Sequence, residues 1–472
     1  MQVDRVEIPS MPADGSSPHL PPELSAMIID HLHDDFPTLK TCSIVCGSWL
    51  PVTRYHLFNS TEVECEYGSW DHLIEFLANA TPSVADSIRE ICLTSGLMAR
   101  DPDNEPHFGV VRSYHLIYLL DHLKHLHTIS LERVHWRCGI EVENERFLSG
   151  WPPVPRSLDT LKLDDVLTLE EGDSTYSGSP LSAKKIGLMQ LFSSIRHLDI
   201  LWAPAEVLSL NPAAIPGAMV HAWSLRDCET PSDLHRSLSE MGSLRCLESL
   251  SIDVQNPLPS LEEAEQRFEI IYDNSATLTS LDIDYLGTPA RSLPPGTDDR
   301  EAAVWNRLRL TERQFPLLES LGFEIELNPG DPFLFQLYNL VYPTEVERKD
   351  PTLWPYIISL SQREPPLVKS LTVTHEVLIN YGLGPRRRYD KDALQEAFVV
   401  DIFNLVDWKS VISALNGWHS LEEVCVHVKV CIYGRYLRYG NGRKVEDALR
   451  RWLKGLSPSI RLVLQHDPPN WI

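Results

Sequence analysis

The sequence lacks an apolar run long enough to cross a membrane. Its longer apolar stretches, such as AFVVDIFNLV, fall far short of the roughly 20 residues that a spanning helix needs. It also lacks an opening apolar segment with a cleavage site, the mark of a secretory signal. The nine cysteines are scattered rather than arranged in a small-domain framework, so disulfides are not expected. These absences predict a soluble protein of a reducing compartment, the cytoplasm or the nucleus.

Positively charged residues are also few compared with acidic ones. The chain has 42 Lys and Arg residues against 66 Asp and Glu residues, a formal net charge of −24. Such a protein is repelled by phosphate backbones and by acidic membrane surfaces. Nucleic acid and membranes are therefore not expected as partners. Three consecutive arginines, Arg386 to Arg388, could bind a phosphate or a nuclear carrier, but a solvated loop is the simpler interpretation.

The usual signatures of catalysis are missing as well. Nucleophile elbows, phosphate-binding loops, dinucleotide fingerprints and the H-E-x-x-H zinc motif do not occur, and His375-Glu376 lacks the second histidine of that motif. Two groups of histidines and cysteines lie close in sequence without zinc-ligand spacing. No catalytic residue, metal or cofactor is therefore expected, and the chain is not expected to be an enzyme. The two groups are His31, His33, Cys42 and Cys46, and His122, His125 and His127.

What the sequence does have is a high apolar content, 43% over 472 residues. This is enough for two or more domains or for an extended repeat array. Residues 1–19 differ from the rest, because they show no apolar period and are rich in Pro and Ser. They are predicted to form a disordered leader.

A helical module is predicted at residues 20–60. Pro21 and Pro22 suit the first turn of a helix, where a missing amide costs nothing. A second helix is expected from Pro37. So short a stretch cannot bury all its large side chains by itself, and part of its apolar surface is expected to need a partner. The side chains with helical spacing are Leu24, Ile28 and Leu32 in the first helix, and Leu39, Cys42, Cys46 and Trp49 in the second.

A short motif recurs beyond residue 70, with apolar residues at its first, fourth and sixth positions. Alternation between the fourth and sixth positions is typical of a strand with one buried face. The central residues of successive motifs are 25 to 53 residues apart. The motifs are Ile88-Ile91-Leu93, Leu126-Ile129-Leu131, Leu158-Leu161-Leu163, Ile195-Leu198-Ile200, a degenerate Val220-Trp223-Leu225, Leu247-Leu250-Ile252, Leu278-Leu281-Ile283, Leu318-Leu321-Phe323, Val368-Leu371-Val373 and Leu421-Val424-Val426.

Helical patterns occupy the intervals between the motifs. They read WDHLIEFLANA, YHLIYLLDHLKHL, KKIGLMQLF, DLHRSLSEM, EEAEQRFEIIY and REAAVWNRLRL. This alternation predicts an α/β fold with parallel strands side by side and helices on the outer face. Residues 61–472 are thus predicted to form an irregular curved solenoid, capped by a helix from Val445 to Leu456 and the strand SIRLVL. Turn-rich stretches at 136–157, 170–180 and 381–392 are predicted loops.

The helical module resembles the F-box, in the version common in fungal proteins with a leucine-rich-repeat-like tail. The resemblance covers Leu20 to Phe58 and implies a small helical unit that docks on a Skp-type adaptor, and through it on the cullin scaffold of a ubiquitin ligase. It rests on the entry Leu20-Pro21-x-Glu23-Leu24, on Ile28, Leu32 and Leu39, on the core Cys42-x-x-Val45-Cys46-x-x-Trp49, on Arg54 and on the exit Leu57-Phe58. The adaptor-binding or supporting positions that it implies are Leu20, Pro21, Leu24, Ile28, Leu32, Leu39, Val45, Cys46 and Trp49.

Two features depart from the family patterns. Gly47 stands where a basic residue is usual after the second cysteine, and a glycine inside a helix would cost roughly 1 kcal/mol relative to alanine. The asparagine that normally follows the repeat strand is also missing. Repeat lengths are therefore expected to vary.

Two functions remain open at this stage. In the first, the chain is the non-catalytic substrate-recognition subunit of a Skp-cullin-F-box type ubiquitin ligase, and its repeats bind an unknown target protein. In the second, the helices only cap a repeat scaffold that binds a protein or a ligand without any adaptor. Capture of a Skp-type adaptor would separate the two.

The strand face opposite the apolar positions is expected to face solvent and to bind the target. Its charged residues are mostly acidic, which predicts a groove for a basic segment, although acidic strands could equally serve solubility. Trp202, directly after a strand, is either an anchor for the target or a core residue. The proposed substrate-binding residues are Asp199, Trp202, Asp253, Asp282, Asp284 and Glu324, and Glu132, Asp164, Lys162 and Arg226 occupy similar positions.

Overall fold

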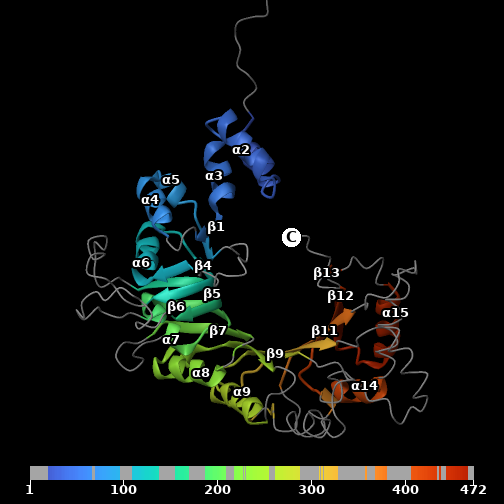
Figure 1. Ribbon diagram of the computed structural model, residues 1–472. Helices are drawn as coiled ribbons and strands as arrows, with labels where there is room; N and C mark the ends of the chain where they lie inside the picture. The colour runs from blue at the N-terminus through green and yellow to red at the C-terminus, as the bar shows by residue number, and fades with distance from the viewer. Residues whose placement is uncertain are drawn as a thin grey trace, which may run out of the picture.

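The computed structural model describes residues 20–65, 70–95, 109–137, 155–168, 187–208, 217–226, 228, 230–254, 261–286, 308, 310–311, 313–327, 357–358, 367–379, 406–432, 435–436 and 443–465. Over these ranges the chain forms three N-terminal helices followed by a curved sheet with helices along it (Figure 1). The predicted mixed α/β class is confirmed. None of the helices in these ranges is both long enough and apolar enough to cross a membrane.

The N-terminal helices are α1 (Pro22–Asp30), α2 (Phe36–Val45) and α3 (Leu50–Phe58). Each carries a proline in its first turn, where the missing amide leaves no hydrogen bond unmade. Asp35 caps α2, because its carboxylate accepts the Thr38 hydroxyl at 2.7 Å and the Thr38 backbone amide at 3.1 Å. These two bonds lower the pKa of Asp35. The two helices predicted from Pro21 and Pro37 are present, but the second ends at Val45, before Cys46 and Trp49, and a third helix begins at Leu50.

One sheet of 14 strands runs through the rest of the described chain. Its order follows the sequence from β1 to β13, except that β3 pairs with β4 and β14 pairs with β12. Neighbouring strands are parallel, and only β13 is antiparallel to its partner. The strands are β1 (Ser60–Cys65), β2 (Glu90–Ser95), β3 (Gly109–Arg112), β4 (Thr128–Arg137), β5 (Arg156–Thr168), β6 (Phe192–Leu201), β7 (Met219–Arg226), β8 (Ser249–Val254), β9 (Ser280–Leu286), β10 (Ser320–Leu327), β11 (Ser370–Ile379), β12 (Glu423–Ile432), β13 (Arg435–Tyr436) and β14 (Arg461–Gln465).

The recurring motif of the sequence forms these strands and the residues that lead into them. Every apolar residue of the ten motifs is at most 4% exposed. Burying one Leu or Ile side chain is worth about 1.5 to 3 kcal/mol relative to leaving it exposed. The same positions also meet across the sheet, as when Leu250 pairs with Leu281. The apolar period therefore sets the register between strands.

Main-chain hydrogen bonds repeat at the entry of successive strands. The Glu248 carbonyl accepts the amides of Thr279 and Ser280 at 2.8 and 3.0 Å. The Thr279 carbonyl accepts those of Glu319 and Ser320 at the same two distances. These bonds join successive strands through backbone atoms alone. The spacing between units can vary because this pattern needs no particular side chain.

The helices lie along one side of the curved sheet and leave its other side, here called the inner face, along the inside of the curve (Figure 1). Four of the predicted helical patterns form α4, α6, α8 and α9. The described part of KKIGLMQLF, from Gly187 on, forms only a 3-10 turn, because Phe192 already begins β6. The helices are α4 (Asp71–Asn79), α5 (Pro82–Ala85), α6 (Ser113–His122), α7 (Ala205–Leu208), α8 (Pro231–Glu240), α9 (Leu261–Asp273), α14 (Trp408–Asn416) and α15 (Arg443–Trp452), and the 3-10 turns are η2 (Leu188–Leu191), η3 (Ser243–Cys246) and η5 (Leu453–Gly455).

The predicted C-terminal helix and strand are present as α15 and β14. Strand β14 adds to the sheet beside β12, where Arg461 pairs with Glu423. Several other predictions lie outside the described residues, namely the leader, the loops at 170–180 and 381–392 with Arg386 to Arg388, most of the loop at 136–157, and REAAVWNRLRL apart from two of its leucines.

Three neighbouring strands share a kink in the backbone. Arg133 in β4, Asp165 in β5 and Trp202 after β6 have φ values of 52°, 51° and 57°, the left-handed region that L side chains rarely adopt. They occupy corresponding places, because the β4–β5 ladder skips Arg133 and Asp165 together. The Val166 amide then donates to the Trp202 carbonyl at 3.0 Å. Beyond the kink, β4 continues and pairs with β3.

Candidate functional site

The helical module, residues 20–58, exposes a large share of the apolar side chains at the surface. Fourteen large apolar side chains are exposed in the described chain, and eight of them lie in this module. Single apolar residues on a surface are ordinary, whereas a concentration of them marks an interaction site. Seven of the eight, here called the exposed apolar set, are Leu20, Leu24, Met27, Ile28, Phe36, Ile44 and Val45.

Helix α1 shows how the chain leaves these side chains outside. Ile29 is 1% exposed and Ser25 is also buried, whereas Leu24 and Ile28 are 46% and 52% exposed. In a helix with 3.6 residues per turn, residues four apart share a face. Ser25 and Ile29 thus form the buried face, and Leu24 and Ile28 form the exposed face beside it. The helix face predicted from Leu24 and Ile28 points away from the interior.

Helices α2 and α3 build the interior of the module. Leu39 and Thr53 are 0% exposed, and the Thr53 hydroxyl donates to the Trp49 carbonyl at 3.0 Å. At the end of α2 the apolar side chains are exposed instead of buried, since Ile44 is 84% exposed and Val45 is 67% exposed. The module therefore has an interior of its own and still leaves apolar groups in water.

The nine adaptor-binding positions predicted from the sequence fall into three groups. Leu39 is buried, so it can support an interface but cannot contact a partner. Met27, Phe36 and Ile44 are exposed, and the prediction missed them because they are not part of the motif. The exposed positions are Leu20, Pro21, Leu24, Ile28 and Val45, and the half-buried positions are Leu32, Cys46 and Trp49.

Gly47 does not lie inside a helix, which corrects the expectation from the sequence. Helix α2 ends at Val45, and Cys46 leaves it in an extended conformation with φ −142° and ψ 124°. Gly47 then belongs to the turn before α3, and a Cβ atom placed there would meet nothing within 4 Å. The helix penalty for glycine does not arise at this position.

The module is attached to the sheet through α3. His56 of α3 hydrogen-bonds to the Asp30 carboxylate of α1 at 2.7 Å, which ties the two helices together. Arg54 donates to the Ser83 hydroxyl in α5 at 2.7 Å, and Phe58 packs against the main apolar core. Helix α3 thus carries the contacts to the repeats, while the exposed apolar set lies on α1, on α2 and next to them.

Charged side chains form rows across the inner face from β1 to β7. The strand pairing places Lys162 beside Asp199. Asp199 is half-buried, and Arg226 on the next strand donates to both of its carboxylate oxygens, at 2.9 and 3.2 Å. Asp199 is therefore on the inner face as predicted, but it is already paired with a cation.

Asp164 lies in the next row, among like charges. It pairs in the ladder with Glu132 on one side and with Leu201, the residue before Trp202, on the other. Partial burial raises the pKa of Asp164, and the charges of Glu132 and Asp165 raise it further, while Arg133 lowers it. Negative charge is thus in excess at this point of the inner face.

The prediction for Asp253 is wrong in its placement. Asp253 is 1% exposed, and its carboxylate binds the guanidinium of Arg267, which is 5% exposed and comes from α9 on the outer side. The same guanidinium also donates to the Cys228 carbonyl at 3.2 Å. A buried charge is tolerated only with such partners. Asp253 is therefore part of the packing between sheet and helices and is closed to a target protein.

Asp282, Asp284 and Glu324 lie together on the far half of the inner face. The ladder pairs Asp282 with Gly322 and Asp284 with Glu324. Asp282 keeps solvent contact, but desolvation by its neighbours raises its pKa, and the charge of Glu324 adds to this. Lys429 reaches across β11 and binds Glu324 at 2.6 Å. This cluster is partly neutralised from within the chain.

Trp202 is exposed, as an anchor for a target would be. Its side chain is 49% exposed, whereas five of the other seven tryptophans in the described ranges are buried and two are half-buried. Leu167, next to the Val166 that binds the Trp202 carbonyl, is 37% exposed. Two large apolar side chains thus stand in water at the ends of neighbouring strands.

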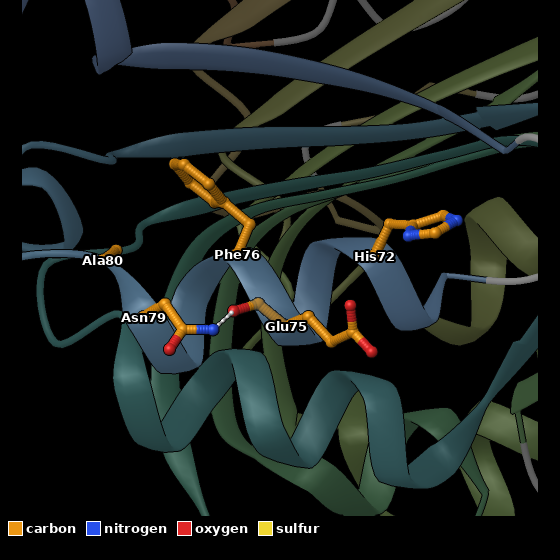
Figure 2. A pocket seen from close by; sticks show the side chains of 5 residues that line it. All are labelled: His72, Glu75, Phe76, Asn79 and Ala80. Atoms are coloured by element: carbon orange, nitrogen blue, oxygen red, sulfur yellow. Dashed lines mark hydrogen bonds between the residues drawn. The ribbon is translucent and has the colours of Figure 1, made fainter.

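A pocket on α4 is open and shallow. Figure 2 shows that its five lining residues come from one helix and the residue after it, with Phe76 and His72 reaching outward. The Asn79 side-chain amide donates to the Glu75 carbonyl at 2.8 Å, which is a bond within the helix. These side chains form a helix surface rather than an enclosed site. They are His72, Glu75, Phe76, Asn79 and Ala80.

The Cys and His side chains of the described sheet whose pKa is shifted are held in their neutral forms rather than activated. Burial, followed by the charge of Glu132, raises the pKa of Cys92 to about 12, so its thiol stays protonated. Burial lowers the pKa of His375 to about 3. Ser48 lowers the pKa of Cys46 by a hydrogen bond, but a catalytic thiol also needs a base within reach. Among the described residues, no group of three or more His, Cys, Asp and Glu could hold a metal ion.

The described surfaces are thus suited to binding. One is the exposed apolar set of the helical module, and the other is the inner face with Trp202 and its carboxylates. No protein-family model matches the chain, and a search of curated proteins found no match either.

Proposed function

We propose that this chain is the substrate-recognition subunit of a ubiquitin ligase of the Skp-cullin-F-box type. The helical module acts as the F-box and docks on a Skp-type adaptor, which connects it to a cullin. The repeated strands and helices act as an irregular leucine-rich-repeat-like solenoid that holds a target protein, in the cytoplasm or the nucleus. The chain adds no catalytic group. It raises the local concentration of target lysines near the conjugating enzyme by tethering.

One observation carries the proposal, namely the exposed apolar set. Leu24, Ile28 and Val45 are exposed positions of the F-box-like motif. Burying a Leu, Ile or Phe side chain in full is worth about 1.5 to 3 kcal/mol, so a partner that covers several of them gains substantial affinity. Such a set, resting on a module with its own interior, supports docking by a second polypeptide.

The contacts of α3 favour a second reading, in which the helices only cap the repeats. Arg54 reaches Ser83 and Phe58 joins the main core, as a cap would require. A cap, however, uses its apolar surface on the chain it covers. Leu24 and Ile28 lie outside those contacts. The two readings agree on the role of α3 and differ in what covers α1.

The test is capture of a Skp-type adaptor by the full chain after co-expression. Leu24→Asp combined with Ile28→Asp places two charges in the docking surface and should abolish capture. Leu317→Asp is the matched control, because Leu317 is 52% exposed like Ile28 but lies next to β10. Thermal unfolding of all the proteins checks that they remain folded. If the double variant captured as much adaptor as the control, the proposal would be wrong and the capping role would stand.

A second experiment addresses the target. Proteins that co-purify with the full chain are compared with those that co-purify with a chain lacking residues 1–60. The adaptor and cullin should disappear from the shorter chain, and the target should remain. Loss of every partner at once would contradict the separation of the two surfaces.

A further inference from the structure

Two exposed apolar side chains, Trp202 and Leu167, lie at the ends of the neighbouring strands β6 and β5 and are here called the Trp202 patch. They are 49% and 37% exposed. The Val166 amide holds the Trp202 carbonyl at 3.0 Å, so the two strands are joined at this point. The indole therefore stands on a fixed backbone, and a ligand would meet it without first ordering a loop.

Carboxylates occupy ladder positions next to this patch. Asp164 is the ladder partner of Leu201, directly before Trp202, and Glu132 is the ladder partner of Asp164. Asp165 follows Asp164 at the kink. The two rows before the kink and the kink itself hold six carboxylates and three cations between β1 and β7. The carboxylates are Glu62, Glu64, Glu132, Asp164, Asp165 and Asp199, and the cations are Arg133, Lys162 and Arg226.

Two of the three described cations near the patch are engaged within the chain, and Arg133 also offsets part of the charge of Asp164. Arg226 is engaged with Asp199 through two hydrogen bonds. The Arg133 guanidinium donates to the Thr94 hydroxyl at 3.3 Å, away from β6. Glu132 accepts the Ser130 hydroxyl at 3.0 Å and also shares a hydrogen bond with the Cys92 thiol, so its described hydrogen-bond partners are uncharged. A cation brought by a partner would find carboxylates beside an exposed aromatic ring.

We propose that the Trp202 patch docks a segment of a partner protein through an arginine or lysine side chain. The cation lies over the indole face, and its hydrogen bonds go to the carboxylates of Asp164 and Glu132. The apolar stem of the same side chain covers Leu167. The inference rests on the proposed function in one respect, since the segment is then the recognition element of the ligase target.

This proposal also predicts that the two acidic clusters of the inner face differ in their ability to bind a basic segment. On the far half, Lys429 already binds Glu324 at 2.6 Å, and Asp253 is closed off by Arg267. At the Trp202 patch the aromatic ring is exposed and the carboxylates outnumber the cations. A basic segment is therefore expected at β5 and β6 rather than at β8 to β10.

The test uses a phage library of random 12-residue peptides, selected on the immobilised full chain. Selected peptides should be enriched in Arg or Lys over the starting library. For the best of them, Trp202→Ala should weaken binding by about tenfold, within the range of a cation–π contact that excludes water. Asp164→Asn should weaken binding and reduce its dependence on salt. Leu317→Ala, at an exposed leucine elsewhere, should leave affinity unchanged.

Three results would overturn the proposal. They are a library that yields no binder, binders without an excess of cations, and equal affinity of Trp202→Ala and the unaltered chain. A fourth is concentration-dependent self-association that Trp202→Ala removes, because the patch would then bind a second copy of the chain. Circular dichroism of each variant verifies the fold before binding is measured.

The peptide-binding test can fail independently of the adaptor-capture test of the proposed function. Ile28→Asp should end adaptor capture and leave peptide affinity unchanged, and Trp202→Ala should do the reverse. If only adaptor capture failed, the patch would still be a binding surface for a basic segment. If only peptide binding failed, the chain would still be an adaptor-bound subunit with a different recognition surface.

Discussion

Asp253 and Arg267 form an ion pair that is closed off from solvent between the sheet and α9. They are 1% and 5% exposed, and the Arg267 guanidinium also holds the Cys228 carbonyl. One guanidinium thus joins β8, α9 and the segment before α8. Its five fixed donors suit this geometry, which a lysine could not reproduce.

Removing one member of this pair should destabilise the protein strongly. Arg267→Met leaves the Asp253 charge buried without its partner, and we expect a loss of about 3 to 5 kcal/mol in the free energy of unfolding. Arg226→Met is the control, since the Asp199–Arg226 pair is partly exposed and should cost at most about 1 kcal/mol. Urea unfolding measures both. Similar losses in the two variants would show that Asp253 is not buried as described.

Two neighbouring isoleucines of α1 should respond in opposite ways to the same substitution. Ile28→Asp should change the free energy of unfolding by less than about 0.5 kcal/mol, because Ile28 is 52% exposed. Ile29→Asp should unfold the module, because Ile29 is 1% exposed and its replacement buries a charge. Hydrogen exchange of the α1 amides reports on the module alone. Protection retained in Ile29→Asp would contradict the described packing.

Substitutions at Trp202 should invert the usual order of stability, in which alanine is more favourable than glycine. At φ 57° alanine keeps the backbone strain of tryptophan, whereas glycine is free of it. Trp202→Gly should therefore be more stable than Trp202→Ala by about 1 kcal/mol, although glycine is normally the less stable of the two in a strand. Thermal unfolding compares the pair directly. A lower unfolding temperature for Trp202→Gly than for Trp202→Ala would mean that the kink is absent in solution.

Asp164 should make stability depend on pH in a defined direction. Its pKa is raised above the ordinary value of 3.8, so the folded state holds the proton more tightly than the unfolded state. The stabilisation from protonation is complete below 3.8 and is lost as the pH rises through the raised pKa. Asp164→Asn should thus be more stable than the parent at neutral pH, and the difference should vanish in acid. A difference independent of pH would rule out charge crowding as its cause.

The strands were predictable because their signal is periodic and repeated. Each motif places Leu-type residues at fixed offsets, and every one of these positions is buried. The first two helices of the module were predictable for a different reason, since Pro22 and Pro37 lie in their first turns. Apolar residues that serve the interior and those that serve a partner look alike in sequence, so Ile28 and Ile29 could be told apart only by the packing.

The predictions for the inner face failed where contacts with other elements determine whether a side chain is exposed or buried. Asp253 occupies a position that strand alternation assigns to solvent, yet Arg267 from α9, the next helix along the chain, binds it in the interior. Asp164 and Glu132 lie at ladder positions next to an exposed aromatic residue, but nothing in their local sequence separates them from Asp282. The kink at Arg133, Asp165 and Trp202 also left no signal, because none of the three is a glycine.

The strand entries described above depend on carbonyl and amide groups alone, as at Glu248 and Thr279. Any amino acid except proline supplies these atoms, so whole units can be duplicated or deleted during evolution without disturbing the units that stay. Each such event would lengthen or shorten the arch in Figure 1 and change the distance between its two ends. The size of the molecule that fits inside would then be set by the number of units, independently of the side chains that recognise it.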